Sequence, residues 1–292
     1  MGVFINGLGI GLTEVNSNSY VLKAYDVKEE SLLFAFWGMG SVIGSIVMAI
    51  AVRYKPPYQM GFVAAIFILV LNIILLLSTK AGWKKQRELL PKEVLKYHSV
   101  TEDEKDVVIK IGEIVKQKEL LLILLSFFIV EGVIVTFNSF VSTIVFKQGM
   151  IGEVRAVEFT MLYFTILFLS RIIFGRIASK FKIINILRVN SFIVIILLIL
   201  LFSNVFTGSV ACVLILLIGF VVAPLIPFLN LHLKSSIEIS KLSPMLGLTD
   251  GTGVIGIIFI SGIASLIMRY TSVNFVELFF VILMSTLYFL LR

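Results

Sequence analysis

The stretch GLGIGLTEVNSNSYVL, residues 7–22, decides the fold, because it is apolar enough for a membrane helix yet carries polar side chains in its middle. Glu14 and Asn18 are four residues apart, so a helix places them on one face. A charged carboxylate at bilayer depth costs roughly 2.5–3.5 kcal/mol, so it faces a bundle interior or a wet cavity. The stretch therefore predicts a helix with a polar spot for a solute or an ion, and glycines that let a neighbouring helix approach closely. A surface loop of chance polarity is the alternative.

The composition predicts an all-α polytopic membrane protein. Of the 292 residues, 59% are hydrophobic and 15% are charged, which is too little charge to cover a soluble domain of this size. Apolar runs of spanning length predict about nine transmembrane helices. The runs are 3–23, 32–52, 58–79, 118–146, 157–178, 184–204, 208–232, 244–268 and 272–291.

Charged loops suggest the orientation and the division of the chain. If the N-terminus lies outside, most Lys and Arg residues fall inside, as the positive-inside rule favours. We then expect the charged loop 80–117 and the C-terminus to be cytoplasmic, and the plasma membrane rather than an internal one. The loop separates a partial N-terminal bundle, 1–79, from a six-helix C-terminal bundle, 118–292.

A weak internal repeat supports this division. WGMGSVIG at 37–44 resembles DGTGVIG at 250–256, an offset of about 213 residues, and the same offset places 58–79 on 271–292. Three consecutive runs thus match three others in order, as parallel repeats do. A symmetric protein would have three further helices upstream, so we expect this chain to correspond to helices four to twelve of twelve.

These features resemble the major facilitator superfamily, and within it the group of fucose permeases and sodium-dependent glucose transporter-like proteins. The Glu14–Asn18 pair is similar to that group's fourth helix, FFIVEGVIVTFNSF at 127–140 to its seventh, and GFVVAPLIP at 219–227 to its tenth. Two departures stand out: Glu131 lies one turn earlier than the family's carboxylate, and Ser170-Arg171 replaces a Gly-Arg pair. The resemblance implies alternating-access transport of a small polar solute, with a hexose as the candidate and Na⁺ or H⁺ as the coupling ion.

Candidate site residues follow from the resemblance and from the polar residues within the apolar runs. The resemblance assigns Glu14 and Asn18 to proton or substrate handling, while intramembrane polarity adds further cavity candidates. The candidates are Glu14, Asn18, Glu131, Asn138 and Asn230 for the cavity, and Arg171, Arg176 and Lys180 for gating or a cytoplasmic motif. For Glu131, a paired structural charge is an equal alternative.

Several other residues favour structural roles. We expect Arg171 to extend toward the headgroups, Asp250 to be interfacial and Glu277 to lie near the surface. Pro224 and Pro227 free main-chain carbonyls, which either line a cavity or are bonded by neighbours.

The remaining motifs exclude other classes of function. Residues 251–256 match G-x-G-x-x-G but lie in a membrane helix, and Gly40-x-x-x-Gly44 favours close helix packing. We expect no enzyme activity, metal, cofactor or nucleic-acid partner, and only a solute, a coupling ion and lipid as ligands. The alternative is a truncated, non-transporting membrane protein that acts as an interaction or regulatory element, or has no activity.

Overall fold

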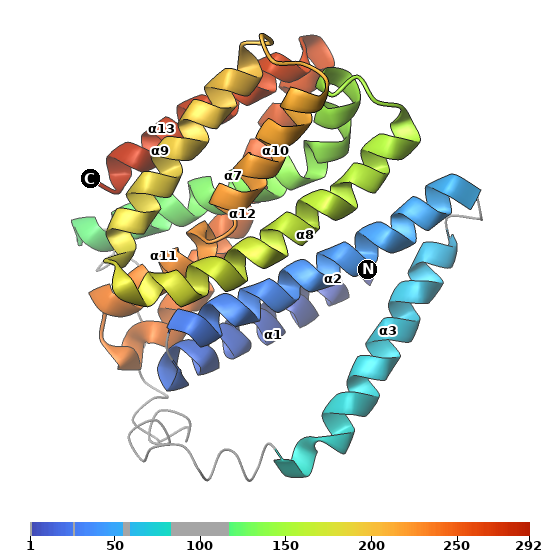
Figure 1. The fold of residues 1–292 in the computed structure, drawn as a ribbon. Helices are drawn as coiled ribbons and strands as arrows, with labels where there is room; N and C mark the ends of the chain where they lie inside the picture. The colour runs from blue at the N-terminus through green and yellow to red at the C-terminus, as the bar shows by residue number, and fades with distance from the viewer. Residues whose placement is uncertain (1, 26, 55–58, 83–116) are drawn as a thin grey trace.

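The computed structural model describes residues 2–25, 27–54, 59–82 and 117–292, and this part of the chain is helical, without a strand (Figure 1). The helices are α1 (Gly2–Ala24), α2 (Val27–Tyr54), α3 (Gln59–Ser78), α7 (Lys118–Gln148), α8 (Glu153–Ile177), α9 (Ile183–Phe202), α10 (Ser209–Val222), α11 (Leu225–Ser236), α12 (Leu242–Tyr270) and α13 (Val273–Leu290). Short 3-10 turns follow α8 (Ala178–Lys180) and precede α12 (Ile239–Lys241). Most of the predicted loop 80–117 lies outside the described residues.

Each predicted apolar run coincides with helix in the structure. The largest difference is at α2, which begins at residue 27 rather than 32. The run 208–232 is divided at Pro224 into α10 and α11. Seven described segments are long and apolar enough to cross a membrane, and α3 adds a shorter apolar run, Ala65–Ser78. The chain is therefore an all-helical, multi-pass membrane protein.

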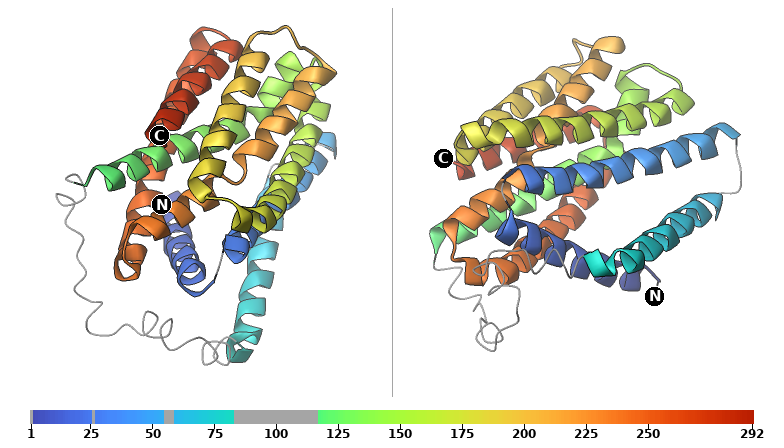
Figure 2. Two further views of the ribbon diagram at one scale, coloured as in Figure 1. Left: turned by 60° about the vertical axis from the view of Figure 1, so that its left-hand side comes forward. Right: turned by 60° about the horizontal axis from the view of Figure 1, so that its bottom comes forward.

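α2 and α8 pack along one another because small residues lie where the two helices cross (Figures 1 and 2). A Cβ atom added to Gly38 would lie 3.3 Å from Cα of Phe168. One added to Gly175 would lie 2.5 Å from Cβ of Ser31. Two glycines, one on each helix, thus allow main chains to approach more closely than larger residues permit.

α7 and α12 form a second close pair, again through glycine. A Cβ atom at Gly256 would collide with the main-chain oxygen of Phe128. A Cβ atom at Gly132 would lie 2.8 Å from the carbonyl oxygen of Gly256. The G-x-G-x-x-G run of α12 therefore serves helix packing.

Other glycines predicted to serve packing do not do so. Gly40 and Gly44 have open space where a Cβ atom would stand, and so do Gly7, Gly9 and Gly11. The expectation of close packing at these five positions is wrong for the described part of the chain, and the α2–α8 crossing uses Gly38 rather than Gly40 or Gly44.

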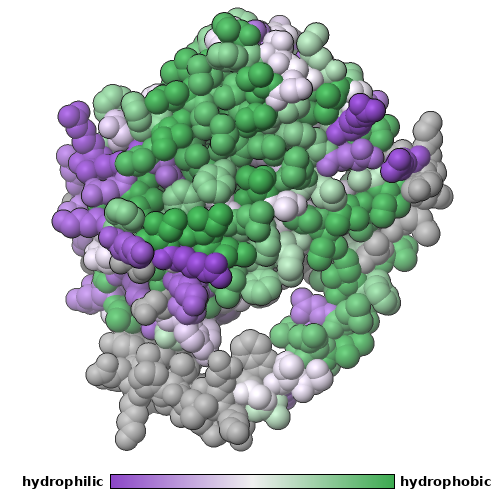
Figure 3. Space-filling model, viewed as in Figure 1, coloured by the Kyte–Doolittle hydropathy of each residue, from purple (hydrophilic) through white to green (hydrophobic). Residues whose placement is uncertain are grey.

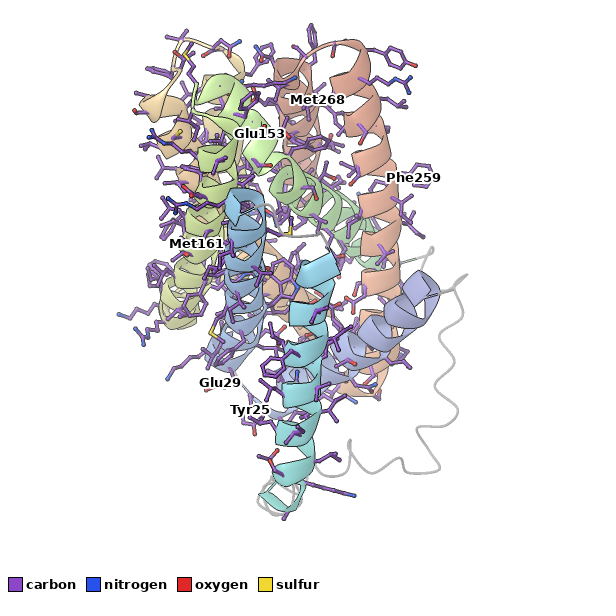
Figure 4. All side chains as sticks on the ribbon, turned by 90° about the vertical axis from the view of Figure 1, so that its right-hand side faces the viewer. Tyr25, Glu29, Glu153, Met161, Phe259 and Met268 are labelled. Atoms are coloured by element: carbon purple, nitrogen blue, oxygen red, sulfur yellow. The ribbon has the colours of Figure 1, made fainter. Side chains whose placement is uncertain are left out.

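The ends of the bundle are polar and its middle is apolar. On the face shown in Figure 3, hydrophilic side chains gather at opposite ends and hydrophobic ones cover the surface between. Glu153 and Met268 lie toward one end, whereas Tyr25 and Glu29 lie toward the other (Figure 4). We call these the Glu153 end and the Tyr25 end. α3 stands apart, and its side chains at 63 and 65–78 are all exposed (Figures 1 and 2).

Candidate functional site

Three carboxylates from three helices lie within electrostatic reach of one another. Glu14 on α1, Glu131 on α7 and Asp250 on α12 repel one another when charged. The helices are held together because α12 packs against both α1 and α7. Asp250 keeps its Oδ2 atom buried and without a hydrogen-bond partner among the described residues. We call Glu14, Glu131 and Asp250 the acidic cluster.

Glycine creates the space that Glu131 occupies. A Cβ atom at Gly253 would overlap the Glu131 carboxylate, so that carboxylate lies directly against the main chain of α12. Asp250 begins the same turn of α12, three residues earlier. Asp250 is half-buried and its carboxylate belongs to the acidic cluster, while its expected position at the membrane interface stays a prediction.

Glu14 and Asn18 share α1 but lie in different surroundings. Glu14 is exposed, whereas Asn18 is 4% exposed. Next to Asn18, the hydroxyl groups of Ser19 and Ser243 form a 2.6 Å hydrogen bond between α1 and α12. Asn18 is therefore packed within the bundle, whereas Glu14 is exposed.

Asn138 is bound to a buried tyrosine. The Tyr163 hydroxyl on α8 donates to Oδ1 of Asn138 at 2.8 Å, and Tyr163 is fully buried. Nδ2 of Asn138 is buried without a partner among the described residues. Spacings of seven and four residues place Glu131, Asn138 and Ser142 on one side of α7, a polar stripe toward the Glu153 end.

Ser142 lines a cavity of about 390 Å³ between α2, α7 and α8, and the accessible surface of this cavity is mostly apolar. Its polar lining consists of Ser41, Ser45, Ser142 and Thr160, joined by Gly44, Met48, Val157 and Phe164. Ser142 also lines a neighbouring cavity of about 290 Å³ together with Glu153. A few hydroxyl groups therefore line the cavities toward the Glu153 end.

Asn230 lies at the contact between α11 and α2. Its Nδ2 donates to Oε1 of Glu30 at 3.1 Å, and both side chains are buried. Glu30 is not among the predicted site residues, because the apolar run that predicts this helix begins only at residue 32. A helix that starts at residue 27 places Glu30 on the same face as Phe34 and Trp37. This spacing is the sequence feature that indicates a buried position for Glu30.

Arg171 is buried and does not reach the headgroups. Only 1% of it is exposed, so the expected extension to the membrane surface is wrong. Its Nε donates to the carbonyl oxygen of Ala223 at 3.0 Å and its Nη1 to that of Phe34. The guanidinium also lies 5.0 Å from the centre of the Trp37 ring. It bridges α2, α8 and the end of α10 because main-chain acceptors and an aromatic face compensate its charge.

Ser170, beside Arg171, has a parallel role. Its hydroxyl donates to the carbonyl oxygen of Phe220. In a regular helix this carbonyl would accept from residue 224 and that of Ala223 from residue 227, but both are prolines. The carbonyls freed by Pro224 and Pro227 are thus bonded by a neighbouring helix, one of the two predicted alternatives.

The other two residues of the predicted cytoplasmic motif are exposed. Arg176 ends α8, and Lys180 lies in the 3-10 turn that follows. A gating role for Arg171, Arg176 and Lys180 remains a prediction, and only Arg171 lies among the packed helices.

Glu277 departs from expectation as well. It is fully buried on α13 and accepts from Nε2 of Gln148 on α7 at 2.9 Å. The expected near-surface position is wrong because α13 turns this side against α7.

Comparison with known proteins places the chain in a family. Residues 1–260 match the model of the Major Facilitator Superfamily. No curated protein matches the chain. Its fold is similar to a crystal structure of a variant of the E. coli fucose:proton symporter FucP, with a TM-score of 0.54 and 12% identity over 94% of this chain and 86% of that chain.

A structure of FucP in the outward conformation has a TM-score of 0.52 and 13% identity, over 94% of this chain and 84% of that chain. At these identities the likeness concerns the fold. The match to the family model covers most of the sequence, and the helical architecture agrees with it. The chain therefore belongs to the Major Facilitator Superfamily.

Proposed function

We propose that the protein transports a small polar solute, a hexose or a similar molecule, by alternating access coupled to H⁺ or Na⁺. Family membership supports transport of a small solute across a membrane. The observation that carries the proposal is the acidic cluster, in which α1, α7 and α12 bring three carboxylates together. Such groups within a membrane bundle are expensive and mark solute or ion pathways.

The 390 Å³ cavity suits a polyhydroxylated solute. Its serines and threonine offer hydroxyl groups beside mostly apolar surface. A few placed polar groups in a mostly apolar cavity are typical of small-molecule sites. In this proposal Glu131 and Glu14 serve the cation or the solute, and Asn18 helps to hold α1.

Reconstituted protein tests the proposal. Purified protein in liposomes should take up labelled L-fucose or D-glucose when an inward H⁺ or Na⁺ gradient is imposed. Glu131→Gln should abolish gradient-driven uptake, and Glu14→Gln should weaken it. The matched control is Glu158→Gln, which removes a carboxylate that is exposed near the Glu153 end.

Two outcomes would contradict the proposal. Full ion-dependent uptake by Glu131→Gln would remove the acidic cluster from the mechanism. Failure of folded wild-type protein to take up or exchange any of a panel of sugars, amino acids and carboxylates would favour the alternative, a non-transporting membrane protein.

Orientation is part of the same proposal. We place the Tyr25 end, loop 80–117 and the C-terminus in the cytoplasm, and the protein in the plasma membrane. Cys212 is the single cysteine, so a Cys212→Ala background allows one new cysteine at a time. A cysteine at Lys180 should react with an impermeant maleimide only after the cells are opened, whereas one at Glu153 should react in intact cells.

A further inference from the structure

Glu30 is a buried carboxylate that lies outside the acidic cluster. It is 0% exposed, in the first turns of α2 next to Glu29, which marks the Tyr25 end (Figure 4). Its hydrogen bond to Asn230 joins residues 200 positions apart in the chain. The contact thus connects the segment before the 80–117 loop with the segment after it.

Two oxygen atoms of this contact, and one of the neighbouring Ser31, are buried without a partner among the described residues. They are Oε2 of Glu30, Oδ1 of Asn230 and Oγ of Ser31. Ser31 and Asn230 are each 1% exposed. A buried charge without compensation is strongly unfavourable, so the carboxylate needs a positive charge or a proton. Carboxylate and amide oxygens are also the donors that hard cations prefer.

The charged groups around Glu30 do not provide a direct partner within the described part of the chain. Lys234 on α11 attracts the carboxylate, but its ammonium donates to the carbonyl oxygen of Tyr25 at 3.3 Å. Arg171 on α8 donates to the main-chain oxygens of Phe34 and Ala223. Asp250 on α12 repels Glu30.

We propose that Glu30 and Asn230 bind the coupling cation, H⁺ or Na⁺, at the contact between α2 and α11. The inference rests on the proposed function and names where the ion is held. One bound cation balances the single carboxylate charge. Because the ligands come from two helices, separating α2 from α11 hydrates the carboxylate and releases the ion to the water on that side.

Asp250 connects this ion site with the acidic cluster. It interacts electrostatically with Glu30 and also with Glu131. Neutralising Glu30 removes one repulsion from Asp250 and so changes the field at Glu131. In this proposal, ion binding and solute binding are linked through Asp250.

The key experiment compares Glu30→Gln with Glu29→Gln in liposomes. The glutamine mimics a permanently neutral carboxylate, so we expect solute counterflow to persist while accumulation falls to equilibration with the outside. Glu29→Gln, the matched control, should accumulate solute as the wild type does. A pH gradient without Na⁺ and a Na⁺ gradient at equal pH distinguish the two cations.

A second measurement does not depend on transport. Thermal unfolding of the purified protein is followed in NaCl and in choline chloride, in acidic and in alkaline buffer. The wild type should be stabilised by Na⁺ or by acid, and Glu30→Gln should lose that response. Asn230→Ala, which keeps the carboxylate, should shift the response to higher cation concentration.

The outcomes separate the two proposals. Unchanged ion-dependent accumulation by Glu30→Gln would overturn the ion site and leave the proposed function standing. A cation response that is lost in Glu30→Gln, together with no transport by the wild type, would support the ion site and overturn the proposed function. An identical thermal response of wild type and Glu30→Gln would overturn the ion site, even if Glu30→Gln folds poorly in membranes.

Discussion

Arg171 donates from its Nε atom to the carbonyl oxygen of Ala223, 3.0 Å away, which is the carbonyl that Pro227 leaves without its helical partner. In the same way, the Ser170 hydroxyl donates to the carbonyl oxygen of Phe220, which Pro224 leaves without its helical partner. Two adjacent residues of α8 thus bind the two carbonyl oxygens that a pair of prolines, three residues apart, leaves free on the neighbouring segment. The break between α10 and α11 and the pair on α8 form one structural unit.

A main-chain N–H restored at residue 227 should reduce the loss of stability that substitution of Arg171 causes. Arg171→Met removes hydrogen bonds from a charged group, each contributing about 1.5–3 kcal/mol, and leaves the Ala223 carbonyl unpaired. In a Pro227→Ala background the new amide bonds that carbonyl, so the same substitution should cost about 1–2 kcal/mol less. Thermal unfolding of the four proteins in the double-mutant cycle measures the difference. Additive effects of the two substitutions would contradict the pairing, and Arg176→Met on the exposed surface is the control.

A single methyl group at Gly256 should force α7 and α12 apart. Gly256→Ala places a Cβ atom against the main-chain oxygen of Phe128, which cannot move aside alone. Overpacking of this kind costs about 1–3 kcal/mol. Gly262→Ala, also on α12 but with open space around it, should have little effect. The melting temperatures of the two variants in detergent test this, and equal values would refute close packing at Gly256.

The buried pair between Gln148 and Glu277 predicts an asymmetric response to mutation. Gln148→Leu removes the amide that donates to Glu277 and leaves a buried carboxyl without that donor, at a cost of about 1–3 kcal/mol. Glu277→Gln keeps a side-chain oxygen that can accept, so it should cost less than about 1 kcal/mol. Thermal unfolding compares the two. A larger loss in Glu277→Gln would mean that the charge itself is needed.

The ion pair between Arg53 and Glu158 should contribute little. The nearest atoms are 3.9 Å apart, and the side chains are 66% and 41% exposed. Exposed pairs contribute about 0–1 kcal/mol, and salt screens them. Arg53→Gln should therefore leave the unfolding temperature nearly unchanged, both at low and at high salt. A marked loss of the same size at low and at high salt would indicate that the pair is protected from solvent in the membrane.

The sequence predicts the helices well because the signal is local. Runs of apolar residues long enough to span a bilayer are visible without knowledge of their neighbours, and each of them is helix in the structure. The break between α10 and α11 is an exception, because the run 208–232 predicts one helix whereas the structure divides it at Pro224, which cannot donate to the helix before it.

The partners of the polar residues were harder to predict because they depend on how helices cross. Arg171 could be placed near the end of its helix, but its burial follows from contacts with α2 and α10. Glu30 resembles a solvated charge in the run VKEES, and only the position of Asn230, 200 residues away, shows otherwise. Two of the three residues of the acidic cluster, Glu14 and Glu131, are candidates from the sequence. Asp250 joins them because α12 packs against both α1 and α7.

The interrupted path of α10 and α11 also explains how a fully buried arginine can do without an acidic partner in the described part of the chain. The end of a helix carries roughly half a negative charge from its unpaired carbonyls. α10 ends at Val222, inside the bundle, and Arg171 binds the carbonyl oxygen of the next residue. Main-chain carbonyl groups thus compensate the charge of Arg171 in place of a carboxylate, and their own charge does not change with pH. The positive charge on α8 is therefore compensated by groups that do not titrate.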